Sequence, residues 1–331
     1  MKRWGVLTVA ALLLLFSAQA GMGVSPGLGA RAIGMGGAYS AVADDGTAVY
    51  WNPAGITQSR FVFMPSIGTV GEWDGTLKFL EELGEGEEYP ELKAGTVSSA
   101  ADLGLGFNTS SFGLNVFGDM TMYSSSEEGK MDITGKGQGV MTLAREFTPL
   151  LAVGGNIKYV YVAQGTTEIG EEIRYGSGSG WAVDLGGMFR IGETIRAAAV
   201  VRDFPLGKIT LKGDKFTGVD LDDTEKWSGK YELPTVLVVG GAVKVPVAGT
   251  LVAADLETPL EGGETSLRVG LEQPVLPLGV LAVRVGGYTV EGDFNFTGGL
   301  GTKLGPVVVD VAGVWADKST TGLYLTAGMR F

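Results

Sequence analysis

The segment WAVDLGGMFRI, residues 181–191, alternates apolar side chains with small or charged ones. Successive side chains of a β-strand point to opposite faces, so this alternation predicts a strand with one apolar face. The apolar face carries Trp181, Val183, Leu185, Phe189 and Ile191, and the other carries Ala182, Asp184, Gly186, Met188 and Arg190. Alternation is also found in soluble β-sandwiches, so this segment alone does not show whether its apolar face is covered by a second sheet or by lipid.

The same period of two recurs along the chain after residue 59. No run of eighteen apolar residues occurs in that part, which rules out helical membrane spans there. We expect about fourteen strands, near residues 60–70, 101–109, 111–123, 132–147, 150–163, 180–191, 194–203, 233–246, 248–257, 264–273, 277–289, 292–304, 306–316 and 322–331.

The connections between these strands alternate in length. Tight turns such as TSS at 109–111 and LGP at 304–306 alternate with longer polar loops such as 71–100 and 204–232. Short turns at one end, long loops at the other and an even number of strands are typical of outer-membrane barrels. The sequence therefore predicts an all-β fold, a transmembrane antiparallel up-and-down β-barrel over residues 60–331 with both termini on the short-turn, periplasmic side.

Charged residues within the strands fall on the face opposite the apolar one. An Arg or Lys that faced lipid at the midplane would cost about 2–4 kcal/mol, so we expect these side chains to point into the lumen. The predicted lumen cations are Lys158, Arg190, Arg196, Arg202, Arg268, Arg284, Lys303 and Arg330, against Asp184, Glu272 and Asp310. Two interpretations stay open: a path that attracts anions, or ion pairs that hold the wall and a plug together.

The composition excludes several classes of function. The 331 residues include no His and no Cys, so Ser-His-Asp triads, Cys-His nucleophiles, imidazole or thiolate zinc sites and disulfides are ruled out. A net charge of -12 argues against nucleic acid as a partner. The acidic runs at 84–91 and 220–226 fit no EF-hand spacing. We expect a protein that is not an enzyme, without metal or cofactor.

The first twenty residues resemble a signal peptide. Lys2 and Arg3 precede an apolar run from Val6 to Phe16, and Ala18-Gln19-Ala20 fits a small-residue cleavage rule. The apolar run is too short to span a membrane comfortably. We expect residues 1–20 to be removed, and residues 21–59 to form a separate segment before the barrel.

That segment contains GLGARAIGMGGAYSAVADDGTAVYWNPAGI, residues 27–56. GLGARA matches a dinucleotide-binding loop only formally, because no strand precedes it. Asp44 and Asp45 are adjacent, so their side chains diverge, and a turn or capping role is favoured over acid–base chemistry. A barrel of about fourteen strands is too wide for its own side chains to fill, so the glycine-rich segment is the natural plug.

The same stretch resembles the N-terminal hatch of FadL/TodX-type outer-membrane transporters, and it is closest to the PorV/PorQ-like branch. The resemblance covers about a tenth of the chain, and the matching residues are Gly34, Met35, Gly36, Gly37, Ala38, Ala41, Ala43, Asp44, Asp45, Tyr50, Trp51, Asn52, Pro53, Ala54 and Gly55. It implies a hatch-closed barrel in the outer membrane that passes small hydrophobic or amphipathic, fatty-acid-like molecules by diffusion. The PorV-like branch implies an alternative, a docking or shuttle component for protein secretion or surface-protein assembly.

The resemblance also assigns roles to other residues. An outer-loop ligand groove is expected at Phe204, Leu206, Phe216 and Trp227, and a lateral gap at a kinked third strand containing Gly113 and Gly118. The terminal Phe331 resembles the signal read by the barrel-insertion machinery, although Thr326 stands where a glycine is usual. The expected partners are the outer-membrane bilayer, that machinery and a hydrophobic small molecule.

Overall fold

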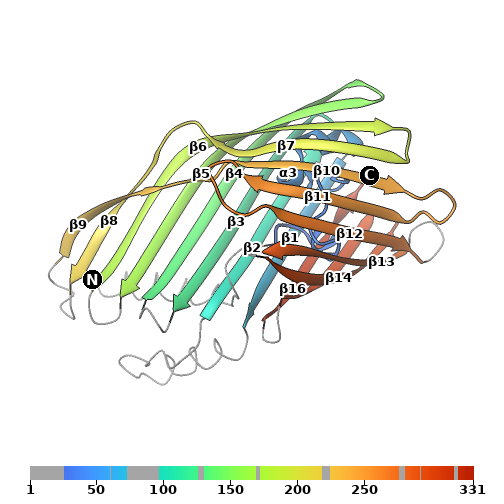
Figure 1. Ribbon diagram of the computed structural model, residues 1–331. Coiled ribbons are helices and arrows are strands. Elements are labelled where there is room, and N and C mark those ends of the chain that lie inside the picture. Colours follow the sequence, from blue (N-terminus) through green and yellow to red (C-terminus); the bar gives the residue numbers. More distant parts are fainter. Residues whose placement is uncertain are drawn as a thin grey trace.

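Fourteen antiparallel strands close into a barrel in the computed structural model (Figure 1). The structure describes residues 26–59, 61–72, 97–125, 130–168, 172–217, 224–275, 280–290, 292–316 and 320–331. The expected signal peptide and the acidic run at 84–91 lie outside these ranges. Among the described residues, no helix is long and apolar enough to span a membrane.

The ring contains β1 to β7 followed by β10 to β16, and it closes where β1 pairs with β16. The strands of the ring are β1 (Phe61–Glu72), β2 (Val97–Thr109), β3 (Phe112–Ser125), β4 (Lys130–Thr148), β5 (Leu151–Glu168), β6 (Glu172–Ile191), β7 (Ile195–Pro205), β10 (Val236–Lys244), β11 (Leu251–Pro259), β12 (Ser266–Pro274), β13 (Leu281–Val290), β14 (Asp293–Leu304), β15 (Val307–Trp315) and β16 (Thr320–Arg330). All fourteen overlap predicted strands. Most ends differ by a few residues, but β6 begins eight residues before the predicted 180–191 and β5 ends five residues after the predicted 150–163.

Two further strands form a hairpin that the sequence analysis placed in a loop. They are β8 (Ile209–Thr217) and β9 (Thr224–Tyr231), and β8 pairs with the part of β6 farthest from the short turns. The wall is uneven in height, because β4, β5 and β6 have 19, 18 and 20 residues whereas β10, β11 and β12 have 9 each. The tall side therefore extends beyond the rest of the ring at the long-loop end (Figure 1).

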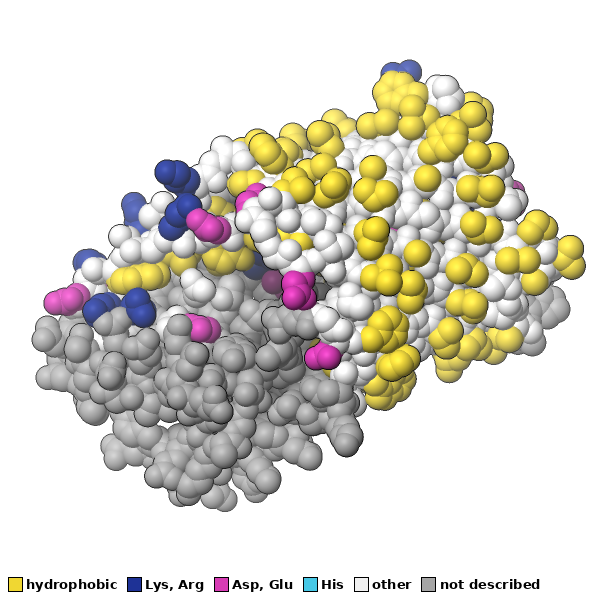
Figure 2. All heavy atoms as spheres, viewed as in Figure 1, with side chains coloured by type: hydrophobic (Ala, Val, Ile, Leu, Met, Phe, Trp, Pro, Cys, Tyr) yellow, Lys and Arg dark blue, Asp and Glu magenta, His cyan; other side chains and the backbone are white. Residues whose placement is uncertain are grey.

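The outer surface of the ring is apolar. Hydrophobic side chains cover the visible strands, and most of the visible charged ones gather at the end where β8 and β9 lie (Figure 2). Trp181, Leu185, Val285, Leu300 and Leu323 are each more than half exposed. Their strand neighbours Ala182, Asp184 and Arg284 are buried, as the period-two pattern requires.

Candidate functional site

The candidate site is the interior of the barrel, which residues 26–59 fill. This segment contains two short helices, α2 (Ala30–Gly34) and α3 (Ala48–Trp51), and the 3-10 helix η1 (Pro53–Gln58). All its residues are buried except for five that are partly exposed: Arg31, Asp44, Tyr50, Thr57 and Gln58. Hydrogen bonds join it to strands on every side of the ring, namely β2, β5, β6, β7, β11, β12, β14 and β16.

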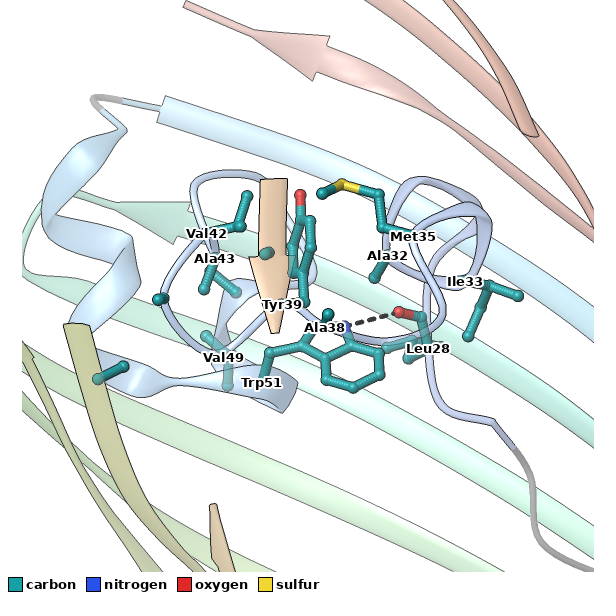
Figure 3. Packing of buried hydrophobic residues seen from close by; sticks show 14 of the residues in the cluster. Leu28, Ala32, Ile33, Met35, Ala38, Tyr39, Val42, Ala43, Val49 and Trp51 are labelled. Carbon is teal, nitrogen blue, oxygen red and sulfur yellow. Dashed lines mark hydrogen bonds between the residues drawn. The ribbon is translucent and has the colours of Figure 1, made fainter. Parts of the chain in front are cut away.

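Apolar side chains of the segment pack together (Figure 3), and they form one buried cluster with apolar side chains of the wall such as Phe117 and Met188. Within the segment, Trp51 donates from Nε1 to the carbonyl oxygen of Leu28, 2.9 Å away. Its ring packs edge-on against Tyr39 and Tyr50, with centroids 6.0 and 5.1 Å apart. Ile33, on α2, is fully buried as well. The segment therefore has a fixed structure instead of an extended plug that merely occupies space.

The WNPAG motif holds the turn after α3. The Asn52 side chain accepts from Ala54 N at 3.0 Å, which caps η1, and Pro53 occupies the first position of that helix. Asn52 Nδ2 donates to the carbonyl oxygen of Ser40 at 2.9 Å and to that of Gly187, on β6, at 3.3 Å. Because the amide already has these partners, the geometry favours a structural role for Asn52 over ligand binding.

Glycines allow the segment to approach the wall closely. Gly36 has φ 65, a left-handed conformation that side chains disfavour, and its N–H donates to Thr297 Oγ1 at 3.0 Å. A methyl group on Gly36 would collide with the backbone of Gly287, on β13. Gly37 follows with φ 73 and lies against Arg268. Gly34, which lies against Gly299 of β14, is a third such contact with the barrel wall, whereas Gly55 packs against Ala43 within the segment.

Asp45 stabilises the turn from inside the segment. Its carboxylate accepts from Tyr39 Oη at 2.7 Å, from Thr47 N at 2.8 Å and from Thr47 Oγ1 at 2.7 Å. These bonds to the residue two positions ahead are those of a turn in which the side chain replaces a backbone acceptor. The geometry is that of the turn role expected for Asp45.

Asp44 instead links the segment to the wall. It pairs with Arg31 of α2, and Arg330 of β16 and Arg196 of β7 lie 3.5 and 3.8 Å from its carboxylate. Burial alone would raise the pKa of Asp44, but the guanidinium groups of Arg31, Arg330 and Arg196 lower it below the ordinary value. The carboxylate therefore stays ionised and connects α2 to two strands on different parts of the ring.

Asp255 of β11 is an anchor that the sequence analysis missed. Its carboxylate accepts from Tyr39 N at 2.9 Å, Ser40 N at 2.8 Å and Ser40 Oγ at 2.8 Å. Asp255 occupies an inward position of a strand that alternates as predicted, so its direction was foreseeable. Its partners were not, because they belong to a segment more than two hundred residues away.

The lumen cations are paired with carboxylates in two tiers. On the short-turn side of the segment, Glu272 binds Arg31 at 2.7 Å and Arg284 at 2.6 Å, and Arg284 also binds Asp310 at 2.7 Å. A cavity of about 160 Å³ opens among these side chains. Its lining combines these charged side chains with apolar ones such as Met64 and Val308.

On the long-loop side, Glu257 lies between Arg202 at 2.7 Å and Arg268 at 3.0 Å. Lys158 binds Asp184 at 2.7 Å and Asp203 at 2.8 Å. Arg202, Arg268, Arg284 and Lys158 are therefore inward as predicted, yet each faces an anion. Of the two interpretations of the lumen charges, the geometry favours the ion pairs.

The two remaining predicted lumen cations lie near the short turns. Arg190 is at the end of β6 and pairs with Glu146 of β4. Lys303 is exposed near the end of β14, beside the cavity on the short-turn side. Neither side chain lies deep in the lumen.

The four residues of the expected outer-loop groove are not brought together. Phe204 and Leu206 are exposed at the end of β7. Phe216 stacks on Tyr175, with centroids 5.9 Å apart, whereas Trp227 packs against the buried cluster around Ile209. Phe216 and Trp227 lie on opposite faces of the β8–β9 hairpin because residues 213 and 227 are paired and side chains alternate along each strand. The segment was predicted as a loop, so this alternation was not applied to it.

Gly113 and Gly118 do not interrupt the third strand. β3 pairs with β4 at each position from Phe112 to Ser125 without a change of register, and it pairs with β2 in the same way. A lateral gap at these glycines stays a prediction that this pairing does not favour. Phe331 lies at the closing seam, where its N–H donates to Phe61 O at 3.0 Å; its part in barrel insertion also stays a prediction.

No family model matches the chain, and no curated protein matches it in sequence. Its fold is that of solved transporters. The toluene transporter TbuX of Ralstonia pickettii has a TM-score of 0.66 at 14% identity, covering 92% of this chain and 99% of that one. The toluene transporter TodX of P. putida has a TM-score of 0.62 at 12% sequence identity, covering 92% of this chain and 99% of that one. A FadL homologue of Pseudomonas aeruginosa has a TM-score of 0.62 at 10% sequence identity, covering 95% of this chain and 99% of that one.

Proposed function

We propose that the protein is an outer-membrane channel for small hydrophobic molecules, closed by residues 26–59 acting as a hatch. The observation that carries the proposal is the buried segment itself, held by Asp255, Thr297 and Asp44 to strands around the whole ring. The ion pairs on the short-turn side support the same role, because Arg31 joins the segment to Glu272 of β12. The pairs on the long-loop side join strands of the wall to one another.

The exterior supports a membrane location. Exposed apolar side chains cover the strands of the ring, and exposed Tyr159 and Trp181 pack together on the outside with ring centroids 5.3 Å apart. Outer-membrane barrels have such an apolar band about 25 Å tall, with aromatic residues at its borders. Trp181 lies ten residues before the end of β6 at Ile191. At about 3.3 Å per residue and a tilt of about 40°, this corresponds to roughly 25 Å of height.

The lumen supports a neutral or weakly polar ligand over an anion. Lys158, Arg202, Arg268 and Arg284 already have carboxylate partners within 3.0 Å, so little unpaired positive charge faces the interior. TbuX and TodX, which share the fold, are described as toluene transporters. A hydrophobic molecule of that kind is the ligand class we assign to this chain.

Toluene uptake is the direct test. Radiolabelled toluene would be offered to a host that lacks such channels, with and without this protein in its outer membrane. We expect faster uptake with the protein, and no such gain from a barrel of similar size that has no hydrophobic ligand. Unchanged uptake, together with mislocalised surface proteins after deletion in the native cell, would favour the docking alternative.

A further inference from the structure

The cavity on the short-turn side lies between the hatch and the wall. Its volume is about 160 Å³, and the residues that line it come from the hatch and from β1, β12, β13, β14, β15 and β16. A cavity needs about 10–15 Å³ to hold one water molecule, so this one has room for several waters or for one small ion such as phosphate. The hatch and the wall therefore enclose a small polar compartment together.

The carboxylates that line this cavity already have donors. Glu272 lies 2.7 Å from Arg31 and 2.6 Å from Arg284, and Asp310 lies 2.7 Å from Arg284. Asp45 accepts its hydrogen bonds from within the hatch. In the described part of the chain, these three acids form no ion pair with the other two cations of the lining.

Those two cations, Lys303 and Arg330, are poorly paired. Lys303 is exposed near the end of β14 and forms no ion pair with any described residue. Arg330 of β16 has one carboxylate nearby, that of Asp44 at 3.5 Å, and Asp44 also pairs with Arg31 of the hatch. The side chain of Arg330 is 28% exposed. Of the charges around this cavity, these two are the ones with capacity for a further partner.

Lys303 and Arg330 face the cavity from either side of β15. Val308 of β15 pairs with Lys303 on one edge and with Gly328 of β16 on the other. Gly328 is two residues before Arg330, so the two positions lie on the same inward face of β16. Neighbouring strands are about 4.8 Å apart, so roughly 10 Å of wall separates β14 from β16. Long Lys and Arg side chains can meet at one ion over that width.

We propose that this cavity binds a small oxyanion of the phosphate type between Lys303 and Arg330. A guanidinium offers parallel N–H donors that match two oxygens of such an ion, and an ammonium adds a compact positive charge. Both side chains face the inside of the barrel, so the ligand is a soluble ion and not a lipid headgroup. The site goes beyond the proposed channel function and does not depend on it, because a hydrophobic molecule brings no charge to either cation.

The bound ion would compete with the hatch for Arg330. Asp44 and an oxyanion need the same guanidinium, whereas the contacts of Asp44 with Arg31 and Arg196 do not involve the cavity ion. Removing the Asp44 charge should therefore strengthen anion binding. The geometry links an ion on the short-turn side to the attachment of the hatch to β16.

Titration of the full chain in detergent with inorganic phosphate tests the site. Isothermal titration calorimetry in chloride buffer of constant ionic strength measures the affinity, and heat-modifiable gel mobility shows that each variant is a folded barrel. Lys303→Gln should weaken phosphate binding at least fivefold. Lys244→Gln removes an exposed lysine at the end of β10, also near the short turns, and should change the affinity less than twofold.

A second matched pair tests the competition for Arg330. Asp44→Asn should strengthen phosphate binding at least twofold, whereas Glu193→Gln, which removes an exposed acid of the β6–β7 turn, should leave it unchanged. Each pair alters the net charge equally, so general attraction of phosphate to the protein would change both members alike.

Two results would overturn the proposed site. One is the absence of saturable phosphate binding to the unmodified protein, and the other is an equal loss of affinity in Lys303→Gln and Lys244→Gln. If Asp44→Asn fails to form the compact gel band, the two lysine variants decide alone. Toluene uptake has no part in this test, so the anion site and the channel function stand or fall separately.

Discussion

At the scale of single residues, Asp44 and Asp45 are neighbours in the chain with separate tasks. Asp45 bonds to Tyr39 and Thr47 within the segment, and Asp44 faces Arg31, Arg196 and Arg330. Adjacent side chains diverge, so one acidic pair stabilises both the fold of the hatch and its attachment to the wall.

Asp44→Asn should loosen the hatch. Removing one charge from a largely buried ion cluster leaves the arginines without their partner, at a cost on the order of 3 kcal/mol. We expect higher ion conductance in planar bilayers than for the unmodified protein. Glu232→Gln, an exposed acid that pairs with Lys230 beyond the end of β9, is the matched control and should leave conductance unchanged. If the ion conductance of the Asp44→Asn variant equals that of the unmodified protein, Asp44 does not hold the hatch to the wall.

Acid should weaken the same attachment. The pKa of Asp44 is lowered in the folded protein, where its arginine partners outweigh burial, so its stabilisation is complete above the ordinary carboxyl pKa of about 4. It is lost as the pH falls through the lower folded value. Conductance of the unmodified protein should therefore rise below about pH 4. The Asp44→Asn variant should lack the part of this rise in conductance that protonation of Asp44 causes. Identical conductance–pH profiles for the variant and the unmodified protein would contradict a contribution from Asp44.

Gly36→Ala should destabilise the hatch by a different mechanism. The left-handed backbone at φ 65 costs a side chain about 1–2 kcal/mol, and the added methyl group would also collide with Gly287. We expect a lower temperature for the loss of the compact gel band. Gly139→Ala, on β4, is the control because no atom lies within 4 Å of its added methyl group. If Gly36→Ala and Gly139→Ala lose the compact band at the same temperature, the close approach of Gly36 to the wall does not stabilise the protein.

At the scale of elements, the β8–β9 hairpin has an inner and an outer face. Trp227 packs on the buried cluster with Ile209 and Leu211, whereas Phe216 stacks on exposed Tyr175. Trp227→Ala should therefore expose the hairpin to protease far more than Phe216→Ala, since losing a packed aromatic costs about 3 kcal/mol and an exposed stack about 1 kcal/mol. Limited proteolysis of protein in detergent measures the difference; equal cleavage would argue that the hairpin is not docked through Trp227.

The strands were predictable because alternation is a local property. Each run of apolar and polar residues carried its own evidence, and all fourteen ring strands were found. The hairpin was missed because Lys212-Gly213-Asp214-Lys215 reads as a polar loop, and its pairing with β6 is not encoded locally. The hatch was located from its motif and position. Its anchors Asp255 and Thr297 were not, because a partner across the lumen depends on the register of distant strands.

At the scale of the whole molecule, the apolar exterior should resist charge most strongly at mid-height. Leu300 is exposed in the middle of β14, and Leu304 is exposed at its end. Leu300→Arg should lower the free energy of unfolding from vesicles by about 2–4 kcal/mol, and Leu304→Arg by about 0–1 kcal/mol. Urea titration of protein in phospholipid vesicles distinguishes them. Equal losses would mean that the apolar band does not face a bilayer.

The position of the hatch in the chain also constrains biogenesis. Residues 26–59 are synthesised before any strand, yet they bind partners as late in the chain as Thr326 of β16. Their complete binding surface exists only once β16 has paired with β1 and joined the two ends of the sheet. A segment that leaves the ribosome before every strand of the ring is thus among the last to reach its native contacts. Closure of the ring and docking of the hatch become a single step of assembly.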